Sequence, residues 1–217
     1  MSEDFRVHLY LYRTQLFTVE GFEVEFCRAC RNALSSLEHL KEGIAEILKG
    51  KIWKAKKSHE KIKIGISACP NACSSPQIKD FGVIAFIKPQ VDLEKCNSCK
   101  ACFRACRENA IDFNGYPSFH EKCIGCGDCM RACKTGAIKG ETYFKVLAGG
   151  RLGRHPRFAE IVAIVKDENV VLRIFGEVLR ISYERNERFS YIDDSIEILK
   201  KRITNLAFSQ VNNRLDC

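Results

Sequence analysis

The chain has 217 residues, 46% of them hydrophobic, and a formal net charge of +8 at pH 7. This length is enough for one substantial hydrophobic core or for two small ones. No run of about 18 apolar residues occurs, and the first residues are too charged for a secretory signal, so we expect neither a membrane span nor export. The basic residues are scattered without a basic tract or a nucleic-acid motif, which argues against nucleic-acid binding.

Hydrophobic periodicity in the N-terminal part predicts both strands and a helix. Residues 5–26 begin with a strand-like alternation and lead into a loop, and apolar residues at helical spacing predict a helix over 29–48. Alternating isoleucines predict a strand over 62–66. A wholly apolar run predicts another strand over 81–87, which the Lys-Pro pair ending at Pro89 should close.

The sequence changes character over residues 90–140, which are rich in cysteine and glycine and poor in long apolar runs. This change indicates an inserted module. Strand-like sequence returns at 141–148, and the remainder from 156 to about 206 is predicted to be mostly helical. An Asp-Asp-Ser stretch ending at Ser195 is a predicted N-cap for a helix over 196–203. The predicted fold class is α+β, with a small cysteine-rich domain set into a larger one.

Cysteine is the most informative residue type, because the chain has 13 of them. We expect a cytoplasmic protein, and in a reducing compartment this density favours metal binding over disulfides. Cys217 stands alone at the end of the sequence and is interpreted as a free thiol. The other cysteines form close-spaced groups.

Two runs in the inserted module repeat with an offset of 27 residues: "CNSCKACFRAC" from Cys96 and "CIGCGDCMRAC" from Cys123. Both have the spacing C-x2-C-x2-C-x3-C. Three thiolates at this spacing surround one face of a four-iron cluster, and the fourth serves the other cluster. The predicted ligand sets are therefore Cys96, Cys99, Cys102 and Cys133 for one [4Fe-4S] cluster, and Cys123, Cys126, Cys129 and Cys106 for the second.

The duplication, the spacing and the "NAI" and "GAI" that follow each run resemble bacterial two-cluster ferredoxins. One departure is that Arg107 and Lys134 follow the fourth cysteines, where the family usually has proline. The alternative is a pair of four-cysteine zinc sites. The resemblance implies two clusters close enough for fast electron transfer between them.

The remaining four grouped cysteines form two pairs outside this module. Each pair is too small for four-coordination, but together they make a four-thiolate set that predicts a third [4Fe-4S] cluster. A zinc site or two buried thiol pairs are the alternatives. The pairs are C-x2-C at Cys27 and Cys30 and C-x3-C at Cys69 and Cys73.

The segment "KIKIGISACPNACSSPQIKDFGVIAF" (61–86) resembles the siroheme–iron–sulfur segment of sulfite and nitrite reductases. The matching features are the Lys-x-Lys strand, the Cys-Pro-Asn turn and the Asp-x-Gly strand. A ferredoxin insertion after that strand, followed by "GGRLGRHPRFAE" (149–160), resembles dissimilatory and anaerobic sulfite reductase subunits in particular. The predicted domains are the first part of a siroheme/[4Fe-4S] reductase-type domain at 1–89, an inserted 2[4Fe-4S] ferredoxin domain at 90–140, and the second part of the reductase-type domain with C-terminal helices at 141–217.

The resemblance implies a siroheme whose iron shares the Cys73 thiolate with the third cluster. It implies that Arg151 and Arg154, with Asn71 of the cysteine turn, bind the cofactor, whose carboxylates need cations. Lys61 and Lys63 would face the substrate anion, donate protons and stabilise developing negative charge. Sulfite and nitrite are the implied substrates.

Two features depart from the family pattern. The upstream cysteine pair is C-x5-C in the family, whereas Val24 stands six residues before Cys30 and Cys27 substitutes here. The family also builds its heme pocket from two halves, and the N-terminal half is largely missing from this sequence, so we expect a homo-oligomer to complete the site. No nicotinamide or flavin fingerprint is present, so we expect an electron-donor protein, a ferredoxin or a flavoprotein subunit. The alternative function is a three-cluster electron-transfer protein without siroheme.

Overall fold

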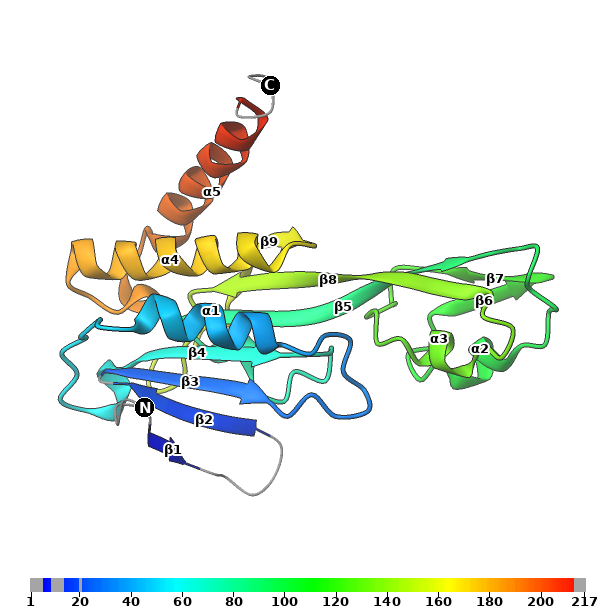
Figure 1. Ribbon diagram of the computed structural model, residues 1–217, viewed down its shortest axis with the longest axis horizontal. Coiled ribbons are helices and arrows are strands. Elements are labelled where there is room, and N and C mark those ends of the chain that lie inside the picture. The colour runs from blue at the N-terminus through cyan, green and yellow to red at the C-terminus, as the bar shows by residue number, and fades with distance from the viewer. Residues whose placement is uncertain (1–5, 9–13, 20, 213–217) are drawn as a thin grey trace.

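The computed structural model describes residues 6–8, 14–19 and 21–212. Within this part of the chain, a seven-stranded mixed sheet has the strand order β1-β2-β3-β4-β5-β8-β9 (Figure 1). The central strands β3, β4 and β5 are parallel, and the outer strands pair antiparallel. The strand bounds are β1 Arg6–His8, β2 Thr14–Val19, β3 Phe22–Cys27, β4 Ile62–Ser67, β5 Phe81–Val91, β8 Ile138–Ala148 and β9 Glu160–Val165.

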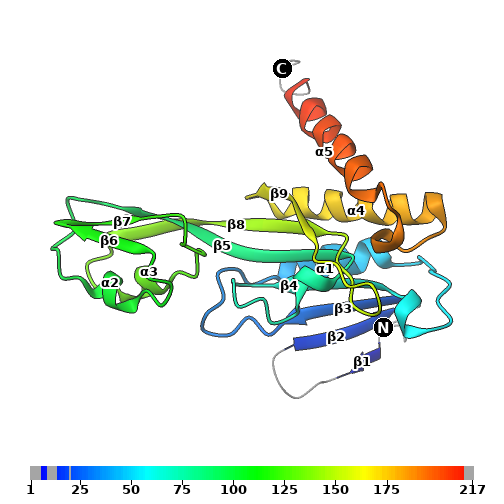
Figure 2. The same cartoon turned by 180° about the vertical axis from the view of Figure 1, so that it is seen from behind.

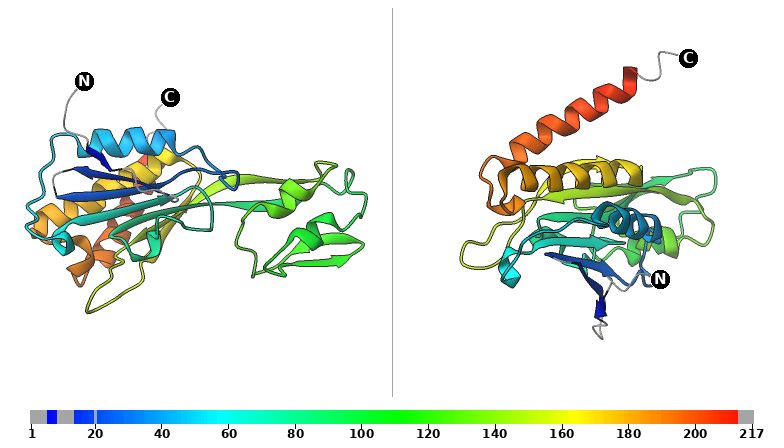
Figure 3. Two further views of the ribbon diagram at one scale, coloured as in Figure 1. Left: turned by 90° about the horizontal axis from the view of Figure 1, so that it is seen from below. Right: turned by 60° about the vertical axis from the view of Figure 1, so that its left-hand side comes forward.

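Two helices cover one face of this sheet, as Figures 1 and 2 show: α1 (Glu38–Leu48) and α4 (Glu168–Arg185). Alternate residues of the central strands point toward them and are fully buried, so each strand contributes one apolar face to a single core. The two helices approach closely at Gly43, where an added Cβ would lie 2.2 Å from Leu172 Cδ1. The last helix, α5 (Ser195–Asn212), leaves the body at a steep angle (Figure 3).

The loop between β4 and β5 folds back across the opposite face of the sheet. It passes so close to Gly65 and Gly82 that a Cβ at Gly82 would lie 2.4 Å from the Pro76 carbonyl oxygen. Glycine at these two positions therefore allows the loop that contains Cys69 and Cys73 to lie on the sheet. Short 3-10 helices occur at Ser58–Glu60, Pro76–Ile78 and Phe189–Tyr191.

Strands β5 and β8 extend beyond the sheet as a two-stranded ribbon that carries a separate lobe (Figures 1 and 3). Pro89 is tolerated in this ribbon because β5 pairs only with β8 there, so no neighbouring strand needs its missing N–H. The lobe, residues 92–137, contains α2 (Ala101–Ala105), a hairpin of β6 (Ile111–Asn114) and β7 (Tyr116–Phe119), and α3 (Asp128–Ala132).

The predicted α+β class is confirmed, but several predicted elements differ from the structure in their bounds or type. Residues 22–27 form a strand rather than a loop, because they pair with both β2 and β4. The helix predicted over 29–48 begins at Glu38, after Leu37 with a left-handed φ of 64°. The strand at 81–87 continues through the Lys-Pro pair as far as Val91. Part of the region predicted as helical, Glu160–Val165, is strand β9, because it pairs with β8.

A buried ion pair ties the C-terminal segment to the sheet. Arg188 donates through Nε to both carboxylate oxygens of Asp80, at 2.9 and 2.7 Å, and through Nη1 to the His59 carbonyl. The backbone amides of Ser190 and Lys63 also donate to this carboxylate, at 3.0 and 2.8 Å. The charge of Asp80 is thus fully satisfied in the interior, as a buried carboxylate requires.

None of the helices in the described ranges is both long and apolar enough to span a bilayer.

Candidate metal centres

The lobe contains two cavities, each lined by four cysteines. The outer one is bordered by Phe113 and Pro117 of the hairpin, and Ser98 of its first loop donates to the Gly115 carbonyl at 2.6 Å. Burial, followed by the neighbouring thiols of Cys133 and Cys96, raises the pKa of Cys102. The cysteines lining this cavity, hereafter the distal group, are Cys96, Cys99, Cys102 and Cys133.

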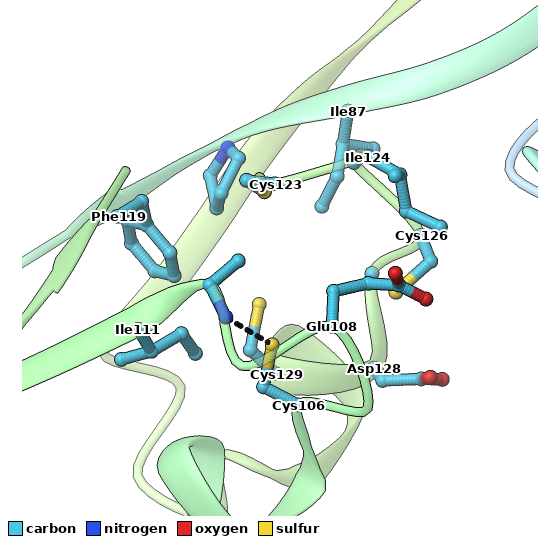
Figure 4. Close-up of a pocket in the computed structure, with 14 residues that line it drawn as sticks. Ile87, Cys106, Glu108, Ile111, Phe119, Cys123, Ile124, Cys126, Asp128 and Cys129 are labelled. Carbon is cyan, nitrogen blue, oxygen red and sulfur yellow. Dashed lines mark hydrogen bonds between the residues drawn. The ribbon is translucent and has the colours of Figure 1, made fainter. Parts of the chain in front are cut away.

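The second cavity lies nearer the sheet and is shown in Figure 4. Its loop is held against β5, because the Ile87 amide donates to the Gly125 carbonyl at 3.0 Å. Burial, followed by the nearby thiol of Cys123, raises the pKa of Cys129 to about 12. The cysteines lining it, hereafter the proximal group, are Cys106, Cys123, Cys126 and Cys129.

Each group therefore takes three cysteines from one repeat and the fourth from the other. Short helices and their arginines repeat as well: Arg104 donates to the Cys99 carbonyl at 3.2 Å, and Arg131 donates to the Cys126 carbonyl at 2.7 Å. The cysteines thus gather in the two crossed sets that the spacing predicts. Among the residues that line the two cavities, the other potential metal ligands are Asp128 and Glu108, which line the proximal cavity.

The third set gathers at the carboxyl ends of β3 and β4. Cys27 ends β3 and its sulfur accepts the Ala68 amide at 3.1 Å, while Cys69 follows β4. Burial, then the adjacent thiols of Cys27, Cys73 and Cys30, raises the pKa of Cys69. Because β3 and β4 are parallel neighbours, the residues that follow them meet at one edge of the sheet. We call Cys27, Cys30, Cys69 and Cys73 the sheet group.

These cysteine sets suit iron–sulfur clusters better than single ions. A zinc ion holds all four sulfurs about 2.3 Å from one centre, whereas a four-iron cluster binds each thiolate to a different iron and spreads them further apart. The two lobe groups come from the C-x2-C-x2-C-x3-C spacing, which is the one that binds four-iron clusters. Burial favours the neutral thiols of Cys69 and Cys129 by raising their pKa, so a metal that binds there must displace their protons.

A further cavity of about 220 Å³ lies between the proximal group and the sheet group. Cys126 lines it from the lobe and Cys69 lines it from the sheet, so one space borders both groups. We call it the junction cavity. Asn71, which was predicted to bind the cofactor, is exposed on its wall.

The basic residues predicted from the resemblance occupy two different places. Lys63 lies on the loop-covered face of β4, with Nζ 3.6 Å from Glu23 Oε1, while Lys61 is half-buried just before this strand. Both precede the cysteine turn, and the four residue steps from Lys63 to Ser67 span about 13 Å of strand. The structure therefore does not bring these lysines into direct contact with the cysteines, and Lys63 shares Glu23 with Lys79, a residue that the sequence did not single out.

Arg151 and Arg154 lie in the loop after β8. Arg151 donates to the backbone carbonyls of His155, at 2.8 Å, and Ser190, at 2.7 Å. Two of the nitrogens of its guanidinium are therefore already hydrogen-bonded to the backbone. Arg154 lines an open recess of about 500 Å³ whose other lining residues are His59, Leu152, Gly153, His155 and Tyr191. The recess borders the start of β4, at the end opposite the cysteine turn.

The fold and the three cysteine groups define an iron–sulfur protein. The chain belongs to the family described as the nitrite and sulphite reductase 4Fe-4S domain, whose pattern matches residues 26–194. The interpretation of the chain as sulfite reductase-like is thereby confirmed.

Individual relatives agree with this assignment. The chain is 36% identical over 168 residues to the coenzyme F420-dependent sulfite reductase of Methanocaldococcus jannaschii, a match covering 70% of this chain and 27% of the relative. It is 34% identical over 50 residues to a subunit of the anaerobic sulfite reductase of Salmonella typhimurium, covering 23% of this chain and 15% of that one. The chain thus spans about a quarter of the length of the F420-dependent relative.

A solved structure of similar fold is dissimilatory sulfite reductase I. The TM-score is 0.51 at 15% identity, and the match covers 82% of this chain and 48% of that chain. At this identity the likeness concerns the fold alone.

Proposed function

We propose that this protein is a sulfite reductase-type oxidoreductase in which three [4Fe-4S] clusters feed electrons to a siroheme. The observation that carries the proposal is the succession of the three cysteine groups along one direction. The distal group borders Ile138, paired with Val91, and the proximal group borders Ile87. These two points on β5 are about 13 Å apart. The junction cavity then continues from the proximal group to Cys69 of the sheet group.

The residues of the sheet group support a cofactor-linked centre at the sheet edge. When bound, the siroheme and its cluster would supply the reducing electrons and the coordination position for the substrate. Cys73 would be the shared thiolate, since it is half-buried at the end of the turn. Arg154 in its open recess is suited to bind a carboxylate, whereas Arg151 would act by holding the loop that presents Arg154.

We propose sulfite as the substrate, because the relatives with named activities are sulfite reductases. A small oxyanion needs cations around it, and Lys61 and Lys63 are the proposed groups that stabilise its charge and donate protons. Lys63 is paired with Glu23, so its charge is partly balanced before substrate binds. Nitrite, an anion of similar size, is the competing substrate.

A second candidate function is a three-cluster electron carrier without siroheme. Two observations favour it: Arg151 already uses donors on backbone carbonyls, and the recess of Arg154 lies at the end of β4 opposite the cysteine turn. In that case the protein would pass electrons to another protein rather than reduce the anion itself.

The deciding experiment is anaerobic reconstitution of the full chain with iron, sulfide and siroheme, followed by a visible spectrum and a sulfite assay. The reductase proposal expects sharp tetrapyrrole bands and sulfite-dependent oxidation of reduced methyl viologen, with nitrite run in parallel. A broad iron–sulfur shoulder without tetrapyrrole bands, and no sulfite turnover, would select the electron carrier.

We also propose that the protein works as a homo-oligomer, receives electrons from a ferredoxin or flavoprotein and resides in the cytoplasm. Apolar side chains stand out on β9 and the loop before it: Phe158 is 77% exposed, Ile161 50% and Ile164 49%. Such a group of exposed apolar residues supports the proposed association. Light scattering of the siroheme-loaded protein should give a dimer or larger, and a monomer with full siroheme would refute this.

A further inference from the structure

The junction cavity shares a wall with the cavity of the proximal group. Ile124, Cys126 and Asp128 line both, and Cys69 stands on the opposite side of the junction. A side chain in this wall therefore lies between the proximal group and the sheet group and is close to each. The lining comes from segments that are well separated in sequence, so only the folded protein creates the space.

Three arginines line the junction cavity: Arg31 from the sheet side, and Arg107 and Arg131 from the lobe. The carboxylates in the lining are Glu108 and Asp128, so positive charges are in excess. Arg131 is already engaged, because it donates to Asp128 at 2.7 Å.

Arg107 also marks a departure in the sequence repeat. It follows Cys106 as Lys134 follows Cys133, at positions where two-cluster ferredoxins usually have proline. Arg107 lines the junction cavity. Lys134 lies instead beside the distal group, since its neighbours Cys133 and Thr135 line the distal cavity. Proline at either position would carry no charge and has no long side chain. The repeat therefore provides two equivalent positions, Arg107 and Lys134, that have different surroundings.

We infer that Arg107 is a positioning residue for electron transfer from the lobe to the sheet, because its guanidinium holds positive charge between the proximal group and the sheet group. The inference rests on the proposed function in requiring clusters at both groups. In the step, the cluster bound by the proximal group loses one electron and is oxidised, and the cluster bound by the sheet group gains it and is reduced. An external reductant, dithionite in the test, replaces the electron.

The physical reason is electrostatic. Each cluster with its thiolates is anionic, and reduction adds a further negative charge, so a cation nearby favours the reduced form. A cation between two such sites lowers the energy of the electron on both sides of the gap.

The test compares the full chain with three variants, R107Q, R107K and K134Q, all reconstituted anaerobically. Redox titration followed by paramagnetic resonance gives the potential of each cluster. Rapid mixing with dithionite and freezing gives the rate at which the sheet-group cluster becomes reduced. R107Q should make the proximal cluster harder to reduce and slow the arrival of electrons at the sheet group about tenfold, equivalent to about 1.4 kcal/mol of activation free energy.

R107K should recover most of the lost electron-transfer rate, because lysine restores the positive charge although it lacks the planar guanidinium. K134Q should leave the proximal potential unchanged and should slow the arrival of electrons at the sheet group much less than R107Q does. Raising the salt concentration should shrink the difference between the wild type and R107Q. The inference is overturned if R107Q matches the wild type, if K134Q slows transfer equally, or if the sheet group holds no cluster.

This test separates the inference from the proposed reductase activity. Its readouts are cluster potentials and cluster reduction, and neither needs siroheme or sulfite. A wild type that lacks sulfite turnover but shows the R107Q effect contradicts the reductase alone. A wild type that reduces sulfite and is insensitive to R107Q contradicts the inference alone.

Discussion

Replacing Asp80 with Asn should destabilise the protein strongly, because it breaks the buried ion pair with Arg188. Asp80 is fully buried and the exposed fraction of Arg188 is 6%, so water cannot take the place of the lost charge. The carboxylate accepts from Arg188 Nε and from the amides of Ser190 and Lys63. Asparagine keeps the shape but turns one acceptor into a donor facing these groups and leaves the guanidinium uncompensated.

The expected cost follows from this geometry. Removing one partner of a buried pair costs about 3–5 kcal/mol of unfolding free energy. For a chain of this size each kcal/mol lowers the Tm by about 2–4 °C, so the lower limit corresponds to a fall of about 6–12 °C. The assay is anaerobic thermal unfolding of the reconstituted protein, followed by circular dichroism and by cluster absorbance.

Glu160→Gln is the matched control, because Glu160 forms an exposed ion pair with Lys200 at 2.9 Å. Exposed pairs contribute little, so its Tm should change by about 2 °C or less. Asp80→Asn should also weaken siroheme retention, since the Ser190 carbonyl accepts from Arg151 and so fixes the loop that bears Arg154. If Asp80→Asn melts within about 2 °C of the wild type, the pair does not hold the C-terminal segment to the sheet.

Three further predictions concern the clusters. Changing Cys106 to Ser should damage the cluster of the proximal group and spare that of the distal group, and paramagnetic resonance showing the reverse would refute the crossed ligation. Anaerobic assay should find about twelve iron and twelve sulfide per chain; a value near eight would mean that the sheet group holds no cluster, and mainly zinc would refute the iron–sulfur assignment. Gly82→Ala should displace the cysteine loop, because the new Cβ would lie 2.4 Å from the Pro76 oxygen, and should remove the sheet-group cluster alone, whereas Gly176→Ala, with no atom near the added Cβ, should leave all clusters intact.

The sequence by itself determined which cysteines lie together in close-spaced runs, and it identified most of the central strands. Spacings of three residues between cysteines are local, so they place thiolates together whatever the rest of the chain does. The alternation of Ile62, Ile64 and Ile66 and the apolar run after Asp80 likewise identify strands with one or both faces buried.

Only the tertiary structure decided the features that depend on partners distant in sequence. Glu160–Val165 becomes a strand because β8 pairs with it, and the predicted helix was the wrong interpretation of the same apolar residues. The sequence suggested that Arg151 binds carboxylates, whereas the fold gives it the carbonyl of Ser190, 39 residues away. The junction cavity depends on the fold in the same way, because the ribbon of β5 and β8 and the parallel pairing of β3 with β4 must together bring Cys126 and Cys69 to one space. Local spacing places three cysteines of each lobe group together, but the fourth cysteine of each, the assembly of the sheet group and the distance between clusters depend on long-range folding.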